Sequence, residues 1–373
     1  MRLLCIIPTM GPGGAERAMS HLLSYFAREC SVTLLTFENR NAVSFYSVPE
    51  SIEYLKGDKL GGRGIRRALQ ILSRPSLIRR AVGARAPDVI VSFTDTTNIT
   101  ALLSCAGLGI PTIISERVDP SEHNIGWIRS FLRDRTYPLA DLIVVPSRRV
   151  AEHFHPSLHS KIRIIGNPIP TPPVTACPSL SNRDGRKRVI AVGRYEPQKG
   201  FDLLVDAFAL IAGAHPDWDL HLIGEGAERP ALEDQVRREG LQSRIKLRGL
   251  VPNVLQELTA AHVMAFPSRY EGFPNALAEG LAVGLPAVGF KRVSGVEDLI
   301  LEEETGFLVD PSDGASGLAK ALSRLLLDPQ LRDTLGTAAR THTNKWAPER
   351  IFARWRDLLS EVATSNSRPL ESV

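Results

Sequence analysis

The chain has few cysteines and no long hydrophobic run, and each shortage argues against a class of protein. Its four cysteines, Cys5, Cys30, Cys105 and Cys177, are scattered with no CxxC spacing, which argues against a zinc site or a disulfide framework. No apolar run approaches the ~18 residues that span a bilayer. The apolar start "LLCII" is too short for a signal-peptide core, and it predicts a buried first strand. With no export signal in the sequence, we expect a cytoplasmic protein.

The composition is otherwise that of a globular protein long enough for two domains, with 373 residues, of which 43% are hydrophobic and 23% charged. Short apolar runs alternate with helical patterns in both halves: "LLCIIP", "VTLLTF", "DVIVSF", "PTIIS", "LIVVP" and "KIRII", then "KRVIAVG", "WDLHLIG", "RIKLRG", "HVMAFP", "LPAVGF" and "GFLV". Continuous apolar strands separated by helices predict parallel sheets covered on both faces. We therefore expect an α/β fold with two doubly wound, Rossmann-like domains facing a cleft.

A proline-rich segment without hydrophobic periodicity separates the two halves. It predicts a first domain at residues 1–170, a linker at 171–186 and a second domain at 187–345. The pattern of "WAPERIFARWRDLLSEVA" predicts an amphipathic helix at 346–363, which we expect to pack back on the first domain. Residues 364–373 are expected to form a flexible tail.

Positive charge is concentrated in one segment. Nine basic residues and one acidic residue lie between Lys56 and Arg85, so this segment carries +8 while the rest of the +4 chain sums to −4. A basic block on a nearly neutral body indicates one anionic partner surface.

The loops that follow the strands are where an open α/β sheet binds its ligands. In "PTMGPGGAER", Gly13 and Gly14 would let backbone N–H groups approach a phosphate or a sugar. The loop matches neither the GxGxxG fingerprint, because Glu16 stands at the third glycine position, nor the Walker pattern. A plain tight turn is the alternative.

Two cations follow the strand "VIAVG" of the second half. Arg194 and Lys199 lie in the loop before a helix, an arrangement that suits a diphosphate, with solvated surface charges as the alternative. Glycine-containing loops also follow the next two strands, in "LIGEGAERPALE" and "RGLVPNVLQEL". In the latter, backbone atoms of Leu250 and Val251 could meet a flat base, although both loops could be simple connections.

The stretch "EGFPNALAE" holds Glu271 and Glu279 eight residues apart. Pro274 suits the first turn of a helix, so the N–H groups of Asn275, Ala276 and Leu277 are expected to point out of the helix end, where an anion binds. Glu271 then lies in the loop and Glu279 one turn into the helix, so they do not form an acid/base pair on one helical face. A carboxylate such as Glu279 suits the vicinal hydroxyls of a ribose.

Together these loops resemble the retaining glycosyltransferases of family 4, which have the GT-B fold. The resemblance rests on "GGAER", on "GR" with Lys199 five residues later and on "EGFPNALAE", and it spans about residues 1–360. It implies that the first domain binds the acceptor and the second binds a nucleotide sugar, without metal or cofactor. The residues implied to bind the donor, through side chain or backbone, are Gly13, Gly14, Arg194, Lys199, Leu250, Val251, Phe273, Asn275, Ala276, Leu277 and Glu279. The residues expected to be catalytic are Glu271, near the transferred sugar, together with Arg194, Lys199 and Arg117.

A closer likeness is to the lipid-linked N-acetylgalactosaminyltransferases of bacterial glycan assembly. It rests on Ser92 to Glu116, on "FLRDRTYPLAD" and on the basic segment before "PDVIVSF". It implies a polyprenyl-diphosphate-linked saccharide as acceptor and a peripheral location on the inner face of the cytoplasmic membrane. A UDP-sugar is the favoured donor.

One position departs from the family. Many relatives carry a catalytic histidine after the strand "PTIIS", where this sequence has Arg117. Arginine cannot act as a base, but it can bind sugar hydroxyls or an acceptor phosphate, and a structural ion pair is the alternative. Glu116, Asp119 and His123 are nearby candidates for the missing histidine's role.

The basic segment "RGIRRALQILSRPSLIRRAVGAR" predicts an amphipathic helix, which Pro75 is expected to split or kink. The arginines expected to meet an anionic membrane and the acceptor diphosphate are Arg63, Arg66, Arg67, Arg74, Arg79 and Arg80. Generic solvated arginines are the alternative. Nucleic acid is disfavoured as a partner because no aromatic residues are interleaved for stacking.

The sequence thus predicts a metal-independent hexosyl or N-acetylhexosaminyl transferase. Three alternatives stay open: a soluble GT-B transferase with a small acceptor, a sugar-nucleotide epimerase and a non-catalytic sugar-nucleotide-binding protein.

Overall fold

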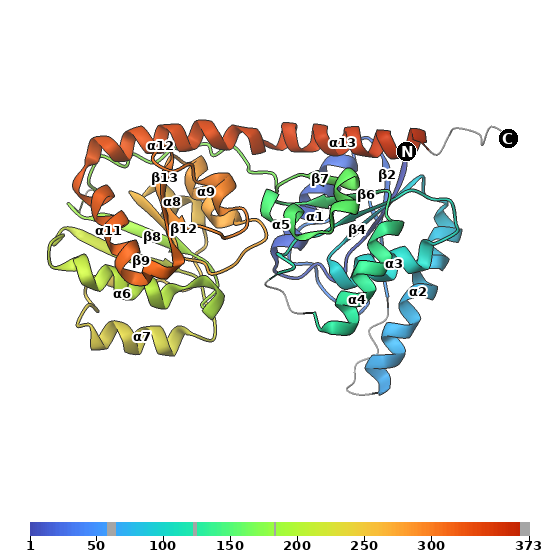
Figure 1. Ribbon diagram of the computed structural model, residues 1–373, viewed down its shortest axis with the longest axis horizontal. Helices are drawn as coiled ribbons and strands as arrows, with labels where there is room; N and C mark the ends of the chain where they lie inside the picture. Colours follow the sequence, from blue (N-terminus) through green and yellow to red (C-terminus); the bar gives the residue numbers. More distant parts are fainter. Residues whose placement is uncertain (58–64, 122–124, 183, 366–373) are drawn as a thin grey trace. The chain divides into compact units, whose positions relative to one another are not determined.

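The computed structural model describes residues 1–57, 65–121, 125–182 and 184–365, which form two compact units. The first unit consists of Met1–Pro168 together with the C-terminal segment that begins at Glu349. The second unit consists of Ile169–Pro348. Each is an α/β domain built on one parallel sheet (Figure 1).

The sheet of the first unit has seven parallel strands in the order β3-β2-β1-β4-β5-β6-β7. Its strands are β1 (Arg2–Ile6), β2 (Ser31–Thr36), β3 (Glu53–Lys56), β4 (Val89–Phe93), β5 (Thr112–Ser115), β6 (Leu142–Val145) and β7 (Ile162–Ile164). Its helices are α1 (Gly14–Phe26), α2 (Ile65–Arg85), α3 (Asp95–Cys105), α4 (Trp127–Thr136), α5 (Arg148–His153) and α13 (Pro348–Ser365), with short 3-10 turns η1 (Tyr137–Leu139) and η2 (Pro156–Lys161).

The sheet of the second unit has six parallel strands in the order β10-β9-β8-β11-β12-β13. Its strands are β8 (Lys187–Val192), β9 (Trp218–Ile223), β10 (Ile245–Leu247), β11 (Val263–Phe266), β12 (Ala287–Phe290) and β13 (Gly306–Val309). Its helices are α6 (Phe201–Ala212), α7 (Arg229–Arg238), α8 (Val254–Thr259), α9 (Asn275–Ala282), α10 (Val296–Leu299), α11 (Gly314–Leu327) and α12 (Pro329–Thr343), with 3-10 turns η3 (Pro197–Lys199), η4 (Pro311–Asp313) and η5 (Asn344–Trp346).

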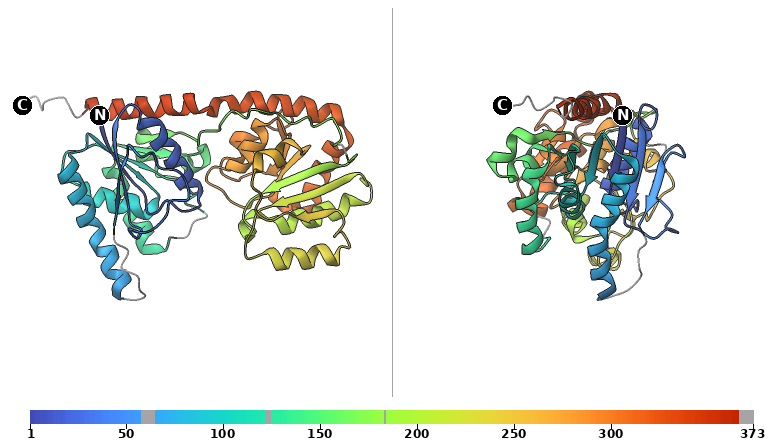
Figure 2. Two further views of the ribbon diagram at one scale, coloured as in Figure 1. Left: turned by 180° about the vertical axis from the view of Figure 1, so that it is seen from behind. Right: turned by 90° about the vertical axis from the view of Figure 1, so that its right-hand side faces the viewer.

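The apolar strands account for both sheets. β4 and β12, for example, are buried along their whole length, because helices cover the sheets on both faces (Figures 1 and 2). On one face of the first sheet, Ile6 and Ile90 pack against Ile78 of α2 and Ala101 of α3. The predicted fold class, two doubly wound parallel-sheet domains, is confirmed.

Two local features differ from expectation. β3 was not predicted, because this four-residue edge strand, "EYLK", is only half-buried and lacks a continuous apolar run. Pro75 was expected to divide the basic segment or kink it. The structure has a single helix, α2, with Pro75 inside it, so the expected division into two helices is wrong, although proline removes one helical hydrogen bond. The kink stays a prediction.

The segment at residues 171–186, expected to be a linker, is held against the second unit by hydrogen bonds. The N–H of Ala176 donates to the carbonyl of Val283 at 2.8 Å, and the Asn182 side chain donates to the carbonyl of Ala260 at 3.1 Å. In the first unit, α13 contacts the sheet and α1. Trp355 stacks on Phe93 of β4 with ring centroids 6.2 Å apart, and Phe352 stacks on Tyr25 of α1 with ring centroids 4.4 Å apart.

Within the parts of the chain that the structure describes, no helix is both long enough and apolar enough to cross a membrane.

Candidate active site

Lys199 and Glu271 form a mostly buried ion pair in the second unit. The Lys199 Nζ lies 2.5 Å from the Glu271 Oε1, and the two side chains are only 15% and 9% exposed. The Phe266 ring lies 5.8 Å from the same ammonium group, so part of its surroundings is apolar. Both residues were predicted from the sequence to lie at the site, but their pairing was not predicted.

Strand order explains why residues 72 positions apart meet. Lys199 follows β8 and Glu271 follows β11, and these strands are neighbours in the sheet. The two loops are also joined directly, because the Gln198 side chain donates to the carbonyl of Tyr270 at 2.8 Å. Gly200, between Lys199 and α6, has φ +65°, and a Cβ there would lie 2.2 Å from the carbonyl oxygen of Pro267. Only glycine fits this approach.

Arg194 also lies in the loop after β8, but its side chain is far more open. It is 65% exposed, and its Nη1 lies 2.7 Å from Glu196 Oε1. A surface pair of this kind contributes little to stability and can be exchanged for another anion. Arg194 is therefore a solvent-exposed cation in the same loop as Lys199.

Helix α9 presents one partly exposed face, formed by Asn275, Ala276 and Glu279, while Leu277 is fully buried. These three positions are i, i+1 and i+4, which share a side of a helix. The expectation that the Asn275 N–H is free was wrong. Pro274 forms a tight turn with φ −80° and ψ 79°, in which the Asn275 N–H donates to the carbonyl of Phe273 at 3.0 Å.

The first helical hydrogen bond of α9 runs from the Ala278 N–H to the carbonyl of Pro274. The N–H groups of Ala276 and Leu277 therefore lie in the first turn, where a helix offers donors to an anion. Glu271 and Glu279 have separate positions, one in the loop and one on the helix. The arrangement can hold an anion and a polyhydroxylated group side by side.

The other residues predicted to contact the donor have contrasting positions. Phe273 is buried and packs edge-to-face on Trp346 with ring centroids 6.2 Å apart, so its backbone rather than its ring is available. Leu250 is 80% exposed in the loop after β10, and Val251 beside it is half-buried. This loop is tied to the one after β9 by a 2.9 Å hydrogen bond between Gly224 N–H and the Gly249 carbonyl.

In the first unit, Gly13 and Gly14 lie at the start of α1, where Gly13 is the N-cap residue. The carboxylate of Glu16 folds back over this turn, so a Cβ on Gly13 would lie 2.1 Å from Glu16 Oε2. Thr9 Oγ1 donates to Glu16 Oε1 at 3.3 Å. The helix start thus already holds a carboxylate of its own, and a phosphate would bind here only if Glu16 moved.

Arg117 is buried rather than open. Its Nη1 donates to Asn167 Oδ1 at 2.9 Å, and its guanidinium lies 4.6 Å from the Phe93 ring centre and 5.9 Å from that of Trp355. Burial lowers the pKa of Arg117, while the charge of Glu116 opposes the shift. These contacts give Arg117 a structural role in joining α13 to β4, through rings and an amide rather than through the ion pair considered above.

Glu116, next to Arg117, belongs to a buried polar group that the sequence did not reveal. The Tyr137 hydroxyl donates to Glu116 Oε2 at 2.6 Å, and the Asn98 side chain donates to the carbonyl of Ser115 at 3.1 Å. Burial, with the charge of Asp95, raises the pKa of Glu116 to about 7. Glu116 is 2% exposed and so is held inside the first unit.

The two remaining candidates for the histidine's role are placed differently. Asp119 is also buried and accepts hydrogen bonds from the N–H and hydroxyl of Ser121 at 2.9 and 2.6 Å. His123 lies outside the described residues.

The basic helix α2 carries three of the six predicted arginines with described side chains. Arg63 and the side chains of Arg66 and Arg67 lie outside the described part of the structure. The guanidinium of Arg74 lies 4.7 Å over the Phe37 ring, and Arg79 Nε donates to the carbonyl of Ser104 at 3.0 Å. Arg74 and Arg79 therefore also anchor α2 to its neighbours.

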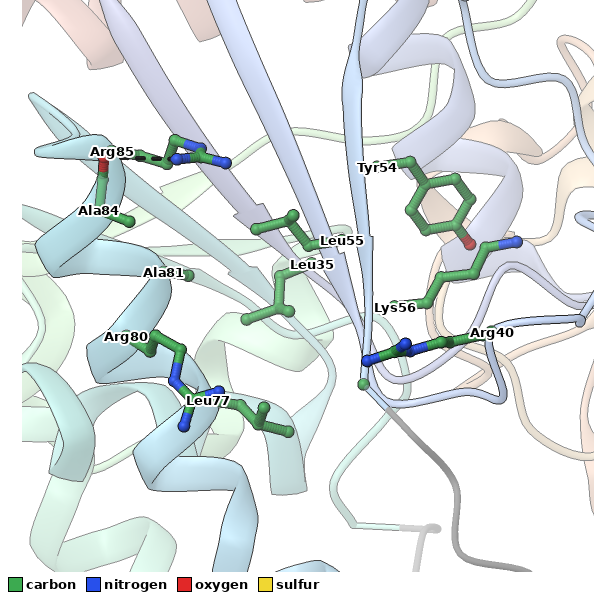
Figure 3. Close-up of a pocket in the computed structure, with 11 residues that line it drawn as sticks. Leu35, Arg40, Tyr54, Leu55, Lys56, Leu77, Arg80, Ala81, Ala84 and Arg85 are labelled. Atoms are coloured by element: carbon green, nitrogen blue, oxygen red, sulfur yellow. Dashed lines mark hydrogen bonds between the residues drawn. The ribbon is translucent and has the colours of Figure 1, made fainter.

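A groove of about 450 Å³ lies between α2 and the edge of the sheet (Figure 3). Its lining is apolar around Leu35, Leu55 and Leu77, and Arg80 lies at its margin. Arg85, also on its margin, pairs with Glu53. An apolar floor with cationic margins suits a ligand that has a hydrocarbon part and an anionic part.

In the described parts of the chain, no three His, Cys, Asp or Glu side chains are grouped so as to hold a metal ion.

The two parallel-sheet α/β units have the architecture of the GT-B class, and the family comparisons identify the chain as a glycosyltransferase. Two family models match the chain, Glycosyltransferase Family 4 over residues 12–172 and Glycosyl transferases group 1 over residues 178–342. The chain belongs to the glycosyltransferases whose two domains these models describe.

Two curated relatives from Campylobacter jejuni match over almost the whole chain. One, a diNAcBac-PP-undecaprenol-linked alpha-1,4-N-acetyl-D-galactosaminyltransferase, is 28% identical, covering 97% of this chain and 99% of its own. The other, an N-acetylgalactosamine-N,N'-diacetylbacillosaminyl-diphospho-undecaprenol 4-alpha-N-acetylgalactosaminyltransferase, is 26% identical, covering 94% of this chain and 97% of its own. The resemblance found in the sequence is confirmed.

Solved structures confirm the fold. A sucrose-phosphate synthase from Thermosynechococcus elongatus is 21% identical, with a TM-score of 0.82 over 98% of this chain and 100% of its own. Anabaena HepE, solved in complex with UDP, is 18% identical, with a TM-score of 0.79 over 97% of this chain and 100% of its own.

Proposed function

We propose that the protein is a retaining, metal-independent transferase that moves a hexosyl or N-acetylhexosaminyl group from a UDP-sugar to a polyprenyl-diphosphate-linked saccharide. The observation that carries the proposal is the buried pair of Lys199 and Glu271 beside the start of α9. A cation, a carboxylate and helix N–H groups in neighbouring loops support the binding of a nucleotide-diphosphate sugar.

In this proposal Lys199 and Arg194 hold the diphosphate, together with the N–H groups of Ala276 and Leu277. Glu279 accepts hydrogen bonds from the ribose hydroxyls, and the backbone near Leu250 and Val251 meets the base. Glu271, fixed by Lys199, lies by the sugar that is transferred. Gly13 and Gly14, at the start of α1, remain proposed contacts for a phosphate or a sugar, which would require Glu16 to move.

During transfer, the bond from the anomeric carbon to the diphosphate oxygen breaks, and the electron pair leaves with the nucleotide diphosphate. A bond forms between that carbon and an acceptor hydroxyl oxygen with the same configuration, and the hydroxyl proton is released. Lys199, Arg194 and the helix N–H groups stabilise the charge that develops on the leaving diphosphate.

The acceptor side of the proposal is supported by the full-length relatives, whose names specify undecaprenol-diphosphate-linked saccharides, and by α2. The arginines of α2 would meet the acceptor diphosphate and an anionic membrane surface, and the groove beside Arg80 offers space for hydrocarbon. The protein would then act as a peripheral enzyme at the inner face of the cytoplasmic membrane.

A small soluble acceptor is a second candidate. A 2-deoxystreptamine N-acetyl-D-glucosaminyltransferase from Niallia circulans is 26% identical over 47% of this chain and 46% of its own. A panel of UDP- and GDP-sugars, screened by thermal shift and then by transfer to either a lipid-linked or a water-soluble saccharide, separates the two candidates. Label in the lipid fraction supports the first proposal, and label only in soluble product supports the second.

A further inference from the structure

Helix α4 carries its apolar residues outward. Trp127 is 81% exposed, Ile128 55%, Phe131 54% and Leu132 36%, whereas the buried residues of this helix are Arg133 and Thr136. An ordinary surface helix buries its apolar stripe and exposes its polar one. α4 does the opposite, because it packs on the domain through the side that carries Arg133 and Thr136 and exposes its apolar side.

The exposed apolar residues form one surface rather than four isolated contacts with water. Positions 127, 128, 131 and 132 are i, i+1, i+4 and i+5, which share one side of a helix. Leu139, 54% exposed, follows in η1, which packs against α4. We name Trp127, Ile128, Phe131, Leu132 and Leu139 the α4 patch. Contiguous exposed apolar side chains of this kind mark a contact with a partner or a membrane.

The charges around the α4 patch are mainly positive. Arg129 and Arg135 are exposed, and the Arg135 guanidinium lies 5.0 Å over the Phe131 ring. Asp134 is the one acidic residue of the helix, and its side chain lies 3.7 Å from the Nε of Arg133. Tryptophan, phenylalanine and leucine on one face, with arginines at the margin, match the boundary between acyl chains and anionic headgroups.

The position of α4 in the first unit agrees with this match. α3 packs against both α2 and α4, and Figures 1 and 2 show α2 and α4 on the same lower side of that unit. The arginines of α2 and those of α4 can therefore meet one negatively charged surface together.

We infer that α4 is a membrane-inserting element, which places Trp127, Ile128 and Phe131 among the lipids of an anionic bilayer while Arg129 and Arg135 contact phosphate groups. This inference rests on the membrane part of the proposed function and extends it, because it adds an apolar contact through α4 to the cationic contact through α2.

The chain offers a built-in reporter for the test. The structure describes all four tryptophans, and Trp127 is the only exposed one, because Trp218, Trp346 and Trp355 are 1%, 9% and 2% exposed. Tryptophan fluorescence of the full-length protein is measured with vesicles of phosphatidylethanolamine and phosphatidylglycerol, and with phosphatidylcholine vesicles. With the anionic vesicles, we expect emission at shorter wavelength, less quenching by acrylamide and quenching by lipids brominated in the acyl chains.

The test variant is Ile128→Glu with Phe131→Glu, which keeps the reporter. Its matched control is Leu210→Glu with Leu327→Glu, at exposed leucines of the second unit that are 65% and 72% exposed. The test variant is expected to lower the affinity for anionic vesicles about tenfold or more, because it removes apolar contact and adds negative charge. The control is expected to bind as the wild type does. Unchanged thermal midpoints would show that both variants fold.

Three outcomes overturn the inference. In the first, the test variant binds vesicles like the wild type and Trp127 stays accessible to acrylamide. Vesicle binding would then be explained by α2 alone. In the second, Trp127 of the wild type becomes protected from acrylamide without vesicles when the protein concentration is raised, and the molecular mass in solution rises with it. The α4 patch would then be an interface between copies of the chain. In the third, the wild type binds no vesicles. Calorimetric titration with UDP keeps these outcomes apart from failure of the donor site, which the α4 variant leaves intact.

Discussion

The Nζ of Lys199 lies 2.5 Å from Oε1 of Glu271, and both side chains are largely withdrawn from water. Each charge is stable in this position because of the other, since an unpaired charge is costly to bury. The pair therefore holds a carboxylate and a cation close to the start of α9. Such preorganisation is what a site for a diphosphate sugar needs.

Breaking this pair from one side should reduce both stability and activity. Lys199→Met leaves the Glu271 carboxylate buried without a partner, so we expect the free energy of unfolding to fall by about 3 kcal/mol. The double variant Lys199→Met with Glu271→Gln should regain most of that loss while transfer stays abolished. Urea denaturation and a transfer assay measure the two effects. Unchanged stability of Lys199→Met would show that the pair is not energetically coupled.

Glu279 should contribute to nucleotide affinity rather than to the fold. It lies on the partly exposed face of α9, and a hydrogen bond to a charged group is worth about 1.5–3 kcal/mol. Glu279→Ala is therefore expected to weaken UDP binding roughly ten- to hundredfold with an unchanged thermal midpoint. Glu239→Ala, at an exposed glutamate after α7, is the matched control. Wild-type turnover in Glu279→Ala would make the ribose assignment wrong.

Glu116 should make stability depend on pH. Its pKa is raised from 4.5 to about 7 in the folded state, so between these values the folded protein holds a proton that the unfolded chain has lost. The contribution of this group to stability therefore falls as pH rises from about 4.5 to about 7. Glu116→Gln removes this pH dependence. The free energy of unfolding of Glu116→Gln minus that of the wild type should therefore be larger at pH 8 than at pH 5.

Urea denaturation of both proteins at the two pH values gives this difference, in which the contributions of the histidines cancel. Glu152→Gln, at an exposed glutamate of α5, should follow the wild type at both pH values. Parallel profiles for Glu116→Gln and the wild type would contradict the raised pKa.

The strands and the loop positions followed from the sequence because they depend on local patterns. β8 and β11 are apolar runs followed by loops that contain Arg194, Lys199 and Glu271. The pairing of Lys199 with Glu271 did not follow, because it depends on β8 and β11 being neighbours in the sheet. The surroundings of Arg117 depend in the same way on Trp355, 238 positions later in the chain.

Two other features lay outside the reach of sequence patterns. The turn at Pro274 uses the Asn275 N–H, and composition does not specify this backbone geometry. α4 is amphipathic, but an amphipathic pattern does not tell which face of a helix the domain covers. In this helix the domain covers Arg133 and leaves Phe131 outside.

The arginines of α2 should govern use of a lipid-linked acceptor. Replacement of Arg66, Arg67, Arg79 and Arg80 by alanine is expected to reduce sedimentation with anionic vesicles and to raise the KM for the lipid-linked acceptor, because each basic residue near such a surface is worth about 1 kcal/mol. The affinity for UDP should not change. Arg237→Ala with Arg238→Ala, on the exposed side of α7, controls for loss of charge elsewhere. Equal sedimentation of wild type and variant would remove α2 from the membrane contact.

The most direct test of the central claim is transfer of a labelled sugar from a UDP-sugar to a polyprenyl-diphosphate-linked saccharide in the presence of a metal chelator. The anomeric configuration of the new bond is then determined by NMR. We expect label in the lipid fraction, release of nucleotide diphosphate only when acceptor is present, and the same anomeric configuration as in the donor. An inverted product, complete dependence on metal, or conversion of the donor without any acceptor would contradict the central claim.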